Sequence, residues 1–305
     1  MIKIIIPLVL LASVSTVSLA ADLAQGVLTA TGFGIADGSK FPRPQARLMS
    51  KRAATVDAQR NLMETIEGVR VTAGTTVENM VVTSDKVGTR VQGMLQGAFI
   101  VNENTYEDAG SWVTEMELGV CVNKSALECQ QKPSLTDIIR EEMAATPPVK
   151  VFDPTNEMIG ASLTADEEAV GEVATVSGGS TEAPATSVSA ESPAEPATGL
   201  IVDVSGQDFS PMLDVRIETA DGAELYGPAL VQLEDGTDWL NWARSVDAAK
   251  QMSQVVGDNP LVVAASGLSD SDHIVVSNDQ AIAIFNSNTS GSNFLKKGKV
   301  IFVVK

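Results

Sequence analysis

The feature that most limits the fold is a low-complexity stretch in the middle of the chain. From about Thr146 to Thr198 the composition shifts to Ala, Ser, Pro, Glu and Gly, as in GEVATVSGGSTEAPATSVSAESPAEPATG. Such a stretch cannot bury enough apolar surface to offset the entropy lost on ordering, so we predict a disordered linker at 146–198. The 305-residue chain is therefore expected to form two folded regions, 21–145 and 199–305.

The N-terminus is typical of a secretory signal peptide. Lys3 precedes a short apolar run at 4–12, and Ser18 and Ala20 are the small residues expected before a cleavage site. We predict a signal peptide at 1–20, and a mature protein that is periplasmic or secreted. The apolar run is too short to cross a bilayer comfortably, and no later segment is longer, so no transmembrane span is expected.

The overall charge excludes some partner classes. The formal net charge is −18, and aromatic residues make up 4% of the chain. A nucleic-acid partner requires a clustered basic face and often stacking aromatic side chains, neither of which is present. An anionic membrane surface is an unfavourable partner for the same electrostatic reason.

The two cysteines, Cys121 and Cys129, are close in the segment VCVNKSALECQ. An exported protein meets an oxidising compartment, so we predict a disulfide between them. Two free thiols are the alternative. A metal site is not expected, because two thiols without a nearby histidine leave the coordination incomplete.

In the first region, ARLMSKRAATVDAQRNLMETIEGVRV (46–71) predicts a long helix that ends at Gly68. On a helical wheel one broad apolar face is predicted to pack on a sheet, with Ala53 and Ala58 flanking it. That face consists of Leu48, Val56, Leu62, Met63 and Ile66. The polar residues opposite, such as Asp57 and Glu64, are predicted to face water.

Strands and helices mix without regular alternation, which favours an α+β class for both regions. In the second region, DWLNWARSVDAAKQMSQVVG predicts a helix containing Trp239 and Trp242, and GKVIFVVK predicts a buried strand. The segments VDAQRNLMETI at 56 and VDAAKQMSQVV at 246 are similar. The two regions are therefore either distantly related or two amphipathic helices that match by chance.

No motif predicts a catalytic, cofactor or metal site. His273, the only histidine, lies beside Asp270 and Asp272, and a His–carboxylate pair could act as a general base in a hydrolase. The same segment, GLSDSDH, alternates acidic and hydroxyl groups but lacks the rest of a calcium-binding loop. A general base at His273 and a calcium site in this segment are kept as alternatives to a simple loop. A soluble protein that binds a small ligand is a further alternative.

Several small and polar positions over residues 25 to 122 form a recognisable set: Arg52, Ala53, Ala54, Asp57, Ala58, Asn61, Leu62, Ile66, Gly68, Val69, Gly93, Gly97 and Ala98. At these positions the stretch resembles the LPP20-type family of bacterial envelope proteins. The resemblance implies a curved sheet wrapped on a long helix, no catalytic residues, and partners among envelope or flagellar basal-body proteins. Members of that family are often lipidated, whereas this chain has no cysteine near the predicted cleavage site.

The sequence therefore predicts a secreted, non-enzymatic envelope protein that acts through protein contacts, including possible self-association. The alternatives are a periplasmic hydrolase that uses His273 and a soluble protein that binds calcium or a small ligand.

Overall fold

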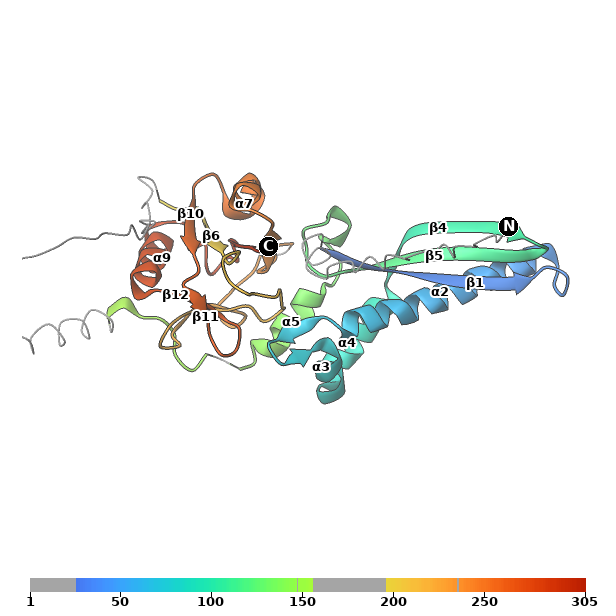
Figure 1. The fold of residues 1–305 in the computed structure, drawn as a ribbon, viewed down its shortest axis with the longest axis horizontal. Helices are drawn as coiled ribbons and strands as arrows, with labels where there is room; N and C mark the ends of the chain where they lie inside the picture. Colours follow the sequence, from blue (N-terminus) through green and yellow to red (C-terminus); the bar gives the residue numbers. More distant parts are fainter. Residues whose placement is uncertain (1–25, 147, 156–195, 235) are drawn as a thin grey trace, which may run out of the picture.

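The computed structural model describes residues 26–146, 148–155, 196–234 and 236–305. The predicted signal peptide at 1–20 and most of the predicted linker at 146–198 lie outside these residues. Helices and sheets occur in both regions, so the predicted mixture of α and β structure is confirmed (Figure 1).

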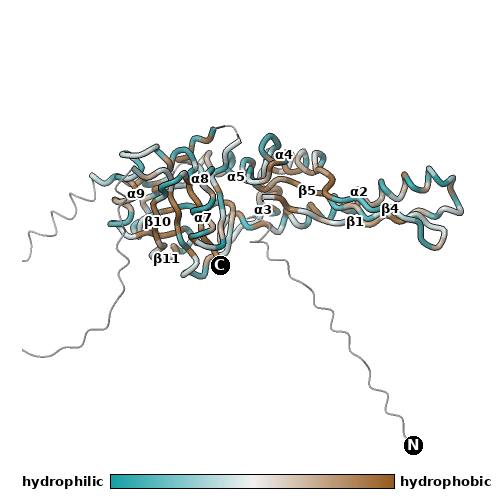
Figure 2. Tube along the Cα trace, turned by 90° about the horizontal axis from the view of Figure 1, so that it is seen from above, coloured by the Kyte–Doolittle hydropathy of each residue, from teal (hydrophilic) through white to brown (hydrophobic). Residues whose placement is uncertain are grey.

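The first region contains a long projection that we call the arm. In it, helix α2 (Arg43–Glu67) packs on a three-stranded antiparallel sheet. The sheet order is β1 (Val27–Asp37), β5 (Ser111–Cys121) and β4 (Phe99–Asp108). Figure 1 shows the arm extending away from the rest of the molecule, and Figure 2 shows that its far end is mainly hydrophilic.

The face that α2 buries differs from the prediction. Leu48 and Val56 are more than 60% exposed, and the buried stripe consists mainly of small residues four positions apart: Ala46, Ser50, Ala54, Ala58, Leu62 and Ile66. Two glycines of β1 explain this close approach. A Cβ atom on Gly32 would lie 2.0 Å from the Ala58 amide nitrogen, and one on Gly34 would lie 2.0 Å from the Ser50 carbonyl oxygen. Helix and strand backbones therefore touch directly.

Short elements join the arm to the second region. Those that follow the C-terminal end of α2 are β2 (Arg70–Thr72), β3 (Thr75–Thr76), α3 (Val77–Thr83) and α4 (Asp85–Gln96). After β5 come a 3₁₀ turn η1 (Leu127–Cys129) and helix α5 (Leu135–Met143). The Cys121–Cys129 disulfide links the end of β5 to η1, as predicted.

The second region holds two four-stranded sheets. In the first, all neighbouring strands are parallel, in the order β10 (Pro260–Ala264), β6 (Gly199–Asp203), β13 (Val300–Val303) and β9 (Asn241–Ala243). The second has the order β11 (Gly267–Leu268), β12 (Ile274–Val276), β7 (Ile217–Thr219) and β8 (Glu224–Tyr226). Its helices are α7 (Val246–Gln251), α8 (Ser253–Val256) and α9 (Asn278–Ser290).

The predicted helix over DWLNWARSVDAAKQMSQVVG is only partly present. Trp242 lies in strand β9, and the helix begins at Val246, after the N-cap Ser245. Trp242 packs against Phe302 of the neighbouring strand, with ring centroids 5.5 Å apart. The similar VDA segments thus lie in a 25-residue helix on an antiparallel sheet and in a 6-residue helix beside a parallel one. Their similarity does not extend to the surrounding fold.

The two regions share one continuous core. A single cluster of buried apolar side chains runs from Leu28 of β1 to Val304 at the C-terminus. The carbonyl oxygens of Arg70 and Val71 in β2 accept hydrogen bonds from the amides of Leu213 and Asp214.

The described start of the predicted linker, residues 146 and 148–155, also packs on the second region. Val151 forms a parallel bridge with Glu224, and the Phe152 amide donates to the Glu224 carbonyl oxygen at 3.0 Å. Phe152 is buried and makes an edge contact with Phe285 of α9, with ring centroids 6.1 Å apart. The buried Phe152 side chain and the backbone bonds of 150–152 thus hold this stretch to the second region. Within the described ranges, no helix has the length and apolar character needed to cross a membrane.

Candidate functional site

The outer face of the arm's sheet points away from α2, and among the described residues Lys132 lies over one part of it, 4.0 Å from the centroid of the Phe99 ring. Even-numbered residues of β1 and β5 pack toward α2, so odd-numbered residues face outward. The register aligns Ile35 with Val113 and Val113 with Tyr106, which makes an apolar row across all three strands. Ile35 is 68% exposed and Tyr106 is 46% exposed. An exposed apolar row on a projecting sheet is a feature of interaction surfaces.

The two edges of this sheet differ in whether their outward backbone groups are hydrogen-bonded. At the β1 edge, the Phe33 amide donates to Asp57 Oδ2 at 2.9 Å, and Asn61 Nδ2 donates to the Thr31 carbonyl oxygen at 2.8 Å. Side chains from α2 therefore bond outward backbone groups of this edge. The prediction that Asp57 only faces water is wrong. At the β4 edge, no strand or side chain bonds the outward backbone groups in the part of the chain that the structure describes.

The charges of the arm are distributed unevenly between the two faces of the sheet. On the helix side, Glu103 pairs with Lys51 and Glu107 pairs with Arg43. On the outer face, Glu115 and Glu117 of β5 form no ion pair with any residue in the described ranges. The outer face thus combines an apolar row with two unpaired carboxylates.

The seam between the two regions is held by a buried carboxylate. Asp238 Oδ2 accepts hydrogen bonds from the Lys124 amide at 3.0 Å and the Thr136 hydroxyl at 2.9 Å. Its Oδ1 accepts from the amides of Trp239 and Leu240. Burial raises the pKa of Asp238 to about 6, although these donors act in the opposite direction. With four donors on one side chain, Asp238 acts as a structural link.

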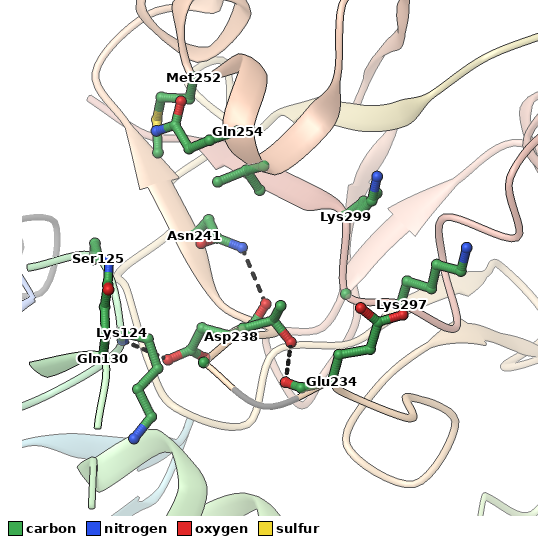
Figure 3. A pocket seen from close by; sticks show the side chains of 14 residues that line it. Lys124, Ser125, Gln130, Glu234, Asp238, Asn241, Met252, Gln254, Lys297 and Lys299 are labelled. Atoms are coloured by element: carbon green, nitrogen blue, oxygen red, sulfur yellow. Dashed lines mark hydrogen bonds between the residues drawn. The ribbon is translucent and has the colours of Figure 1, made fainter. Parts of the chain in front are cut away.

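A cavity of about 430 Å³ lies beside this link, and Figure 3 shows its lining. Asn241 at its wall is already bonded to the carbonyl oxygens of Asp238 and Val300. Figure 3 shows the side chains of Lys124, Lys297 and Lys299 extending away from the centre of the cavity. The Lys124 ammonium instead pairs with Asp137 Oδ2 at 3.1 Å. Because its charged groups diverge, this cavity does not resemble a catalytic centre.

The carboxylate partner of His273 differs from the two aspartates named for the hydrolase alternative. The His273 Nδ1 lies 3.1 Å from Glu218 Oε2 of β7, whereas the expected neighbour Asp272 pairs with Arg70 of the first region at 3.0 Å. Arg216, next to them on the same sheet, bridges Asp214 and Glu224 at 3.0 Å each. Burial raises the pKa of Glu224, against the opposing effect of Arg216. The His273 ring thus contacts Glu218 within the second region, while the neighbouring Asp272–Arg70 ion pair crosses the seam between the two regions.

The segment GLSDSDH does not form a cation site in this conformation. Asp272 has a left-handed φ of 61° and directs its carboxylate to Arg70. The amide of His273 donates to the Ser269 hydroxyl, which closes a tight loop between β11 and β12. Among the described residues, no three His, Cys, Asp or Glu side chains converge as a metal site would require.

Sequence patterns did not reveal the most distinctive groups. A lone aspartate such as Asp238 gives no signal, because its burial depends on Lys124 and Thr136, which are more than 100 residues away. The open β4 edge also has no local signal. It follows from the sheet order, in which β5 lies in the centre.

Comparison with known families finds a match over residues 199–305, to the family described as the second domain of Treponema pallidum Tp0624. The matched stretch is about a third of the chain, so the likeness concerns the second region alone. No curated protein matches the chain.

The resemblance of residues 25–122 to the LPP20-type family is wrong. The family match falls on the second region, and no LPP20 match is found over the first. The positions that suggested it have a simpler physical explanation in this fold. Ala54 and Ala58 permit close packing on β1, and Asp57 and Asn61 bond its edge. Any helix that packs this closely on a glycine-containing strand favours small residues at such positions.

Proposed function

We propose that this chain is a non-catalytic interaction protein that presents the arm to a partner protein. The observation that carries the proposal is the asymmetry of the arm's sheet. One face is packed on α2 and the β1 edge is bonded by α2 side chains, while the apolar row on the outer face and the β4 edge are free among the described residues. A sheet whose only function was to stabilise the fold would not require exposed apolar side chains at Ile35 and Tyr106.

The rest of the described structure, which we call the body, supports this proposal because it fixes the position of the arm. The continuous core, the link at Asp238 and the Arg70–Asp272 ion pair resist rotation of one region against the other. An exported location, in the periplasm or outside the cell, is part of the proposal, and a disulfide is consistent with it. The hydrolase alternative would rest on the half-buried His273–Glu218 pair, and among the described residues no Ser, Thr or Cys side chain is hydrogen-bonded to the His273 ring.

The test is affinity capture of the full chain from its native cells, followed by identification of discrete neighbours. The double variant Phe33→Ala with Ile35→Ala removes exposed apolar side chains from the arm, both of which are more than half exposed. We expect it to lose the captured neighbour while its thermal unfolding is nearly unchanged.

The matched control is Val149→Ala, which removes a fully exposed apolar side chain on the body. It should capture the same neighbour as the unmodified protein. Equal loss in both variants, or retention in the arm variant, would contradict the proposed role of the arm.

A further inference from the structure

The outward backbone groups of β4 follow from the hydrogen bonds of the sheet. The Phe33 amide points away from β5, because it donates to Asp57. Its cross-strand partner Glu115 must then direct its own backbone groups toward β4, where it is aligned with Asn104. Since neighbouring residues alternate, the amides and carbonyls of Glu103, Thr105 and Glu107 point to the open edge.

The β4 edge lacks most of the sequence features that keep an edge strand from pairing with a strand of another chain. Segment 99–108 contains no lysine, arginine or proline, and it is ten residues long. The register shift between Ile100 and Asn102 limits only its beginning. A run of pairing positions from Asn102 to Asp108 therefore stays open.

We infer that the β4 edge binds an extended segment of a partner protein by strand addition, and that this segment carries basic residues. The inference rests on the proposed function of the arm. A strand added antiparallel to β4 would place outward side chains opposite Asn102, Asn104 and Tyr106. The rows containing Asn102 and Asn104 continue to the unpaired Glu117 and Glu115 on β5. Lysine or arginine at those two partner positions reaches these carboxylates across two strand spacings, about 9.6 Å.

The third row defines the other feature of the partner. Opposite Tyr106, an apolar or aromatic residue extends the row formed with Val113 and Ile35. From its N-terminus, the partner segment therefore has an apolar residue followed by two basic residues at alternating positions. A second copy of β4 is a poor occupant. It would supply asparagine and tyrosine at these positions and leave four carboxylates unmatched on one face.

The experiment measures binding of a fluorescent peptide to the full chain by polarisation. The peptide has an aromatic residue and then two lysines at alternating positions, separated by threonines. Thr105→Pro removes one outward amide while leaving the ladder to β5 intact, since proline is tolerated on an edge strand. Thr105→Val, the matched control, keeps that amide and removes the hydroxyl that contacts Thr114.

We expect saturable binding to the unmodified protein and to Thr105→Val, and at least tenfold weaker binding to Thr105→Pro. The double variant Glu115→Gln with Glu117→Gln should weaken binding by about tenfold, and a peptide with glutamates in place of lysines should not bind. Equal binding to both Thr105 variants, or no effect of the carboxylate changes, would overturn the inference. A concentration-dependent dimer that is abolished by Thr105→Pro, in protein that does not bind the peptide, would also overturn the inference. Loss of the natural neighbour in the Phe33 and Ile35 variant would still support the arm as the binding element.

Discussion

The buried carboxylate at the seam allows a quantitative test. Asp238 has a folded-state pKa of about 6 against an ordinary value of 3.8. The folded protein therefore binds this proton more tightly than the unfolded chain, so the group's favourable contribution is fully present below pH 3.8 and is lost as the pH rises through about 6. The two pKa values differ by about 2.2, which corresponds to a loss of about 3 kcal/mol in the free energy of unfolding, at about 1.4 kcal/mol for each tenfold change in proton affinity.

The perturbation is Asp238→Asn, which keeps the shape but cannot ionise. At low pH the variant should be less stable by about 1–3 kcal/mol, because its amide group faces donors such as the Lys124 amide and the Thr136 hydroxyl. As the pH rises, only the unmodified protein loses stability at this position. The difference between the two should therefore shrink by about 3 kcal/mol over the whole titration, and by about 1.4 kcal/mol between pH 5 and pH 8.

The assay is urea unfolding of both proteins at a series of pH values, with free energies from linear extrapolation. Other titrating groups are common to both proteins and cancel in the difference. Leu62→Ala is the control, because it removes core packing, costs about 2–5 kcal/mol, and changes no proton binding at its site. A difference for Asp238→Asn that stays constant, or grows with pH, would refute the reasoning.

Three further predictions concern the framework. Gly34→Ala should destabilise the chain by about 3 kcal/mol in urea unfolding, because its Cβ would meet the Ser50 carbonyl oxygen, and backbone cannot yield as a side chain can; an unchanged midpoint would contradict the close approach. Replacing Cys121 and Cys129 by serine should cost at most about 3 kcal/mol, given so short a loop, and a fall well beyond that would assign the bridge a larger role. Cleavage at a protease site inserted within 156–195 should leave two fragments that co-elute on gel filtration, since they share one core; fragments that separate would disprove that core.

The sequence predicted those features that depend on local patterns. The long helix ending at Gly68 and the closing strand β13 are both present. The bridge between Cys121 and Cys129 followed from their close spacing and from the expectation that the chain is exported. Hydrophobic period, caps and turn residues act over a few positions, so one chain segment carries enough information to specify them.

Features that depend on distant partners were predicted incorrectly or not at all. Leu48 and Val56 were assigned to the buried face because a helical wheel does not register that Gly32 and Gly34 draw the alanine stripe inward. Trp242 was assigned to a helix because its neighbours suit one, yet pairing with β13 makes it part of a strand.

The central claim, that the arm is the part of the molecule that contacts a partner, is tested most directly by site-specific photo-crosslinking in native cells. A photoreactive residue would replace Tyr106 or Ile35 on the arm, and Val82 or Val149, which are also exposed, as controls off the arm. The account predicts a discrete crosslinked product of defined mass from the two arm positions and none from the controls. Products from the controls alone, with both arm positions silent in folded and abundant protein, would contradict it.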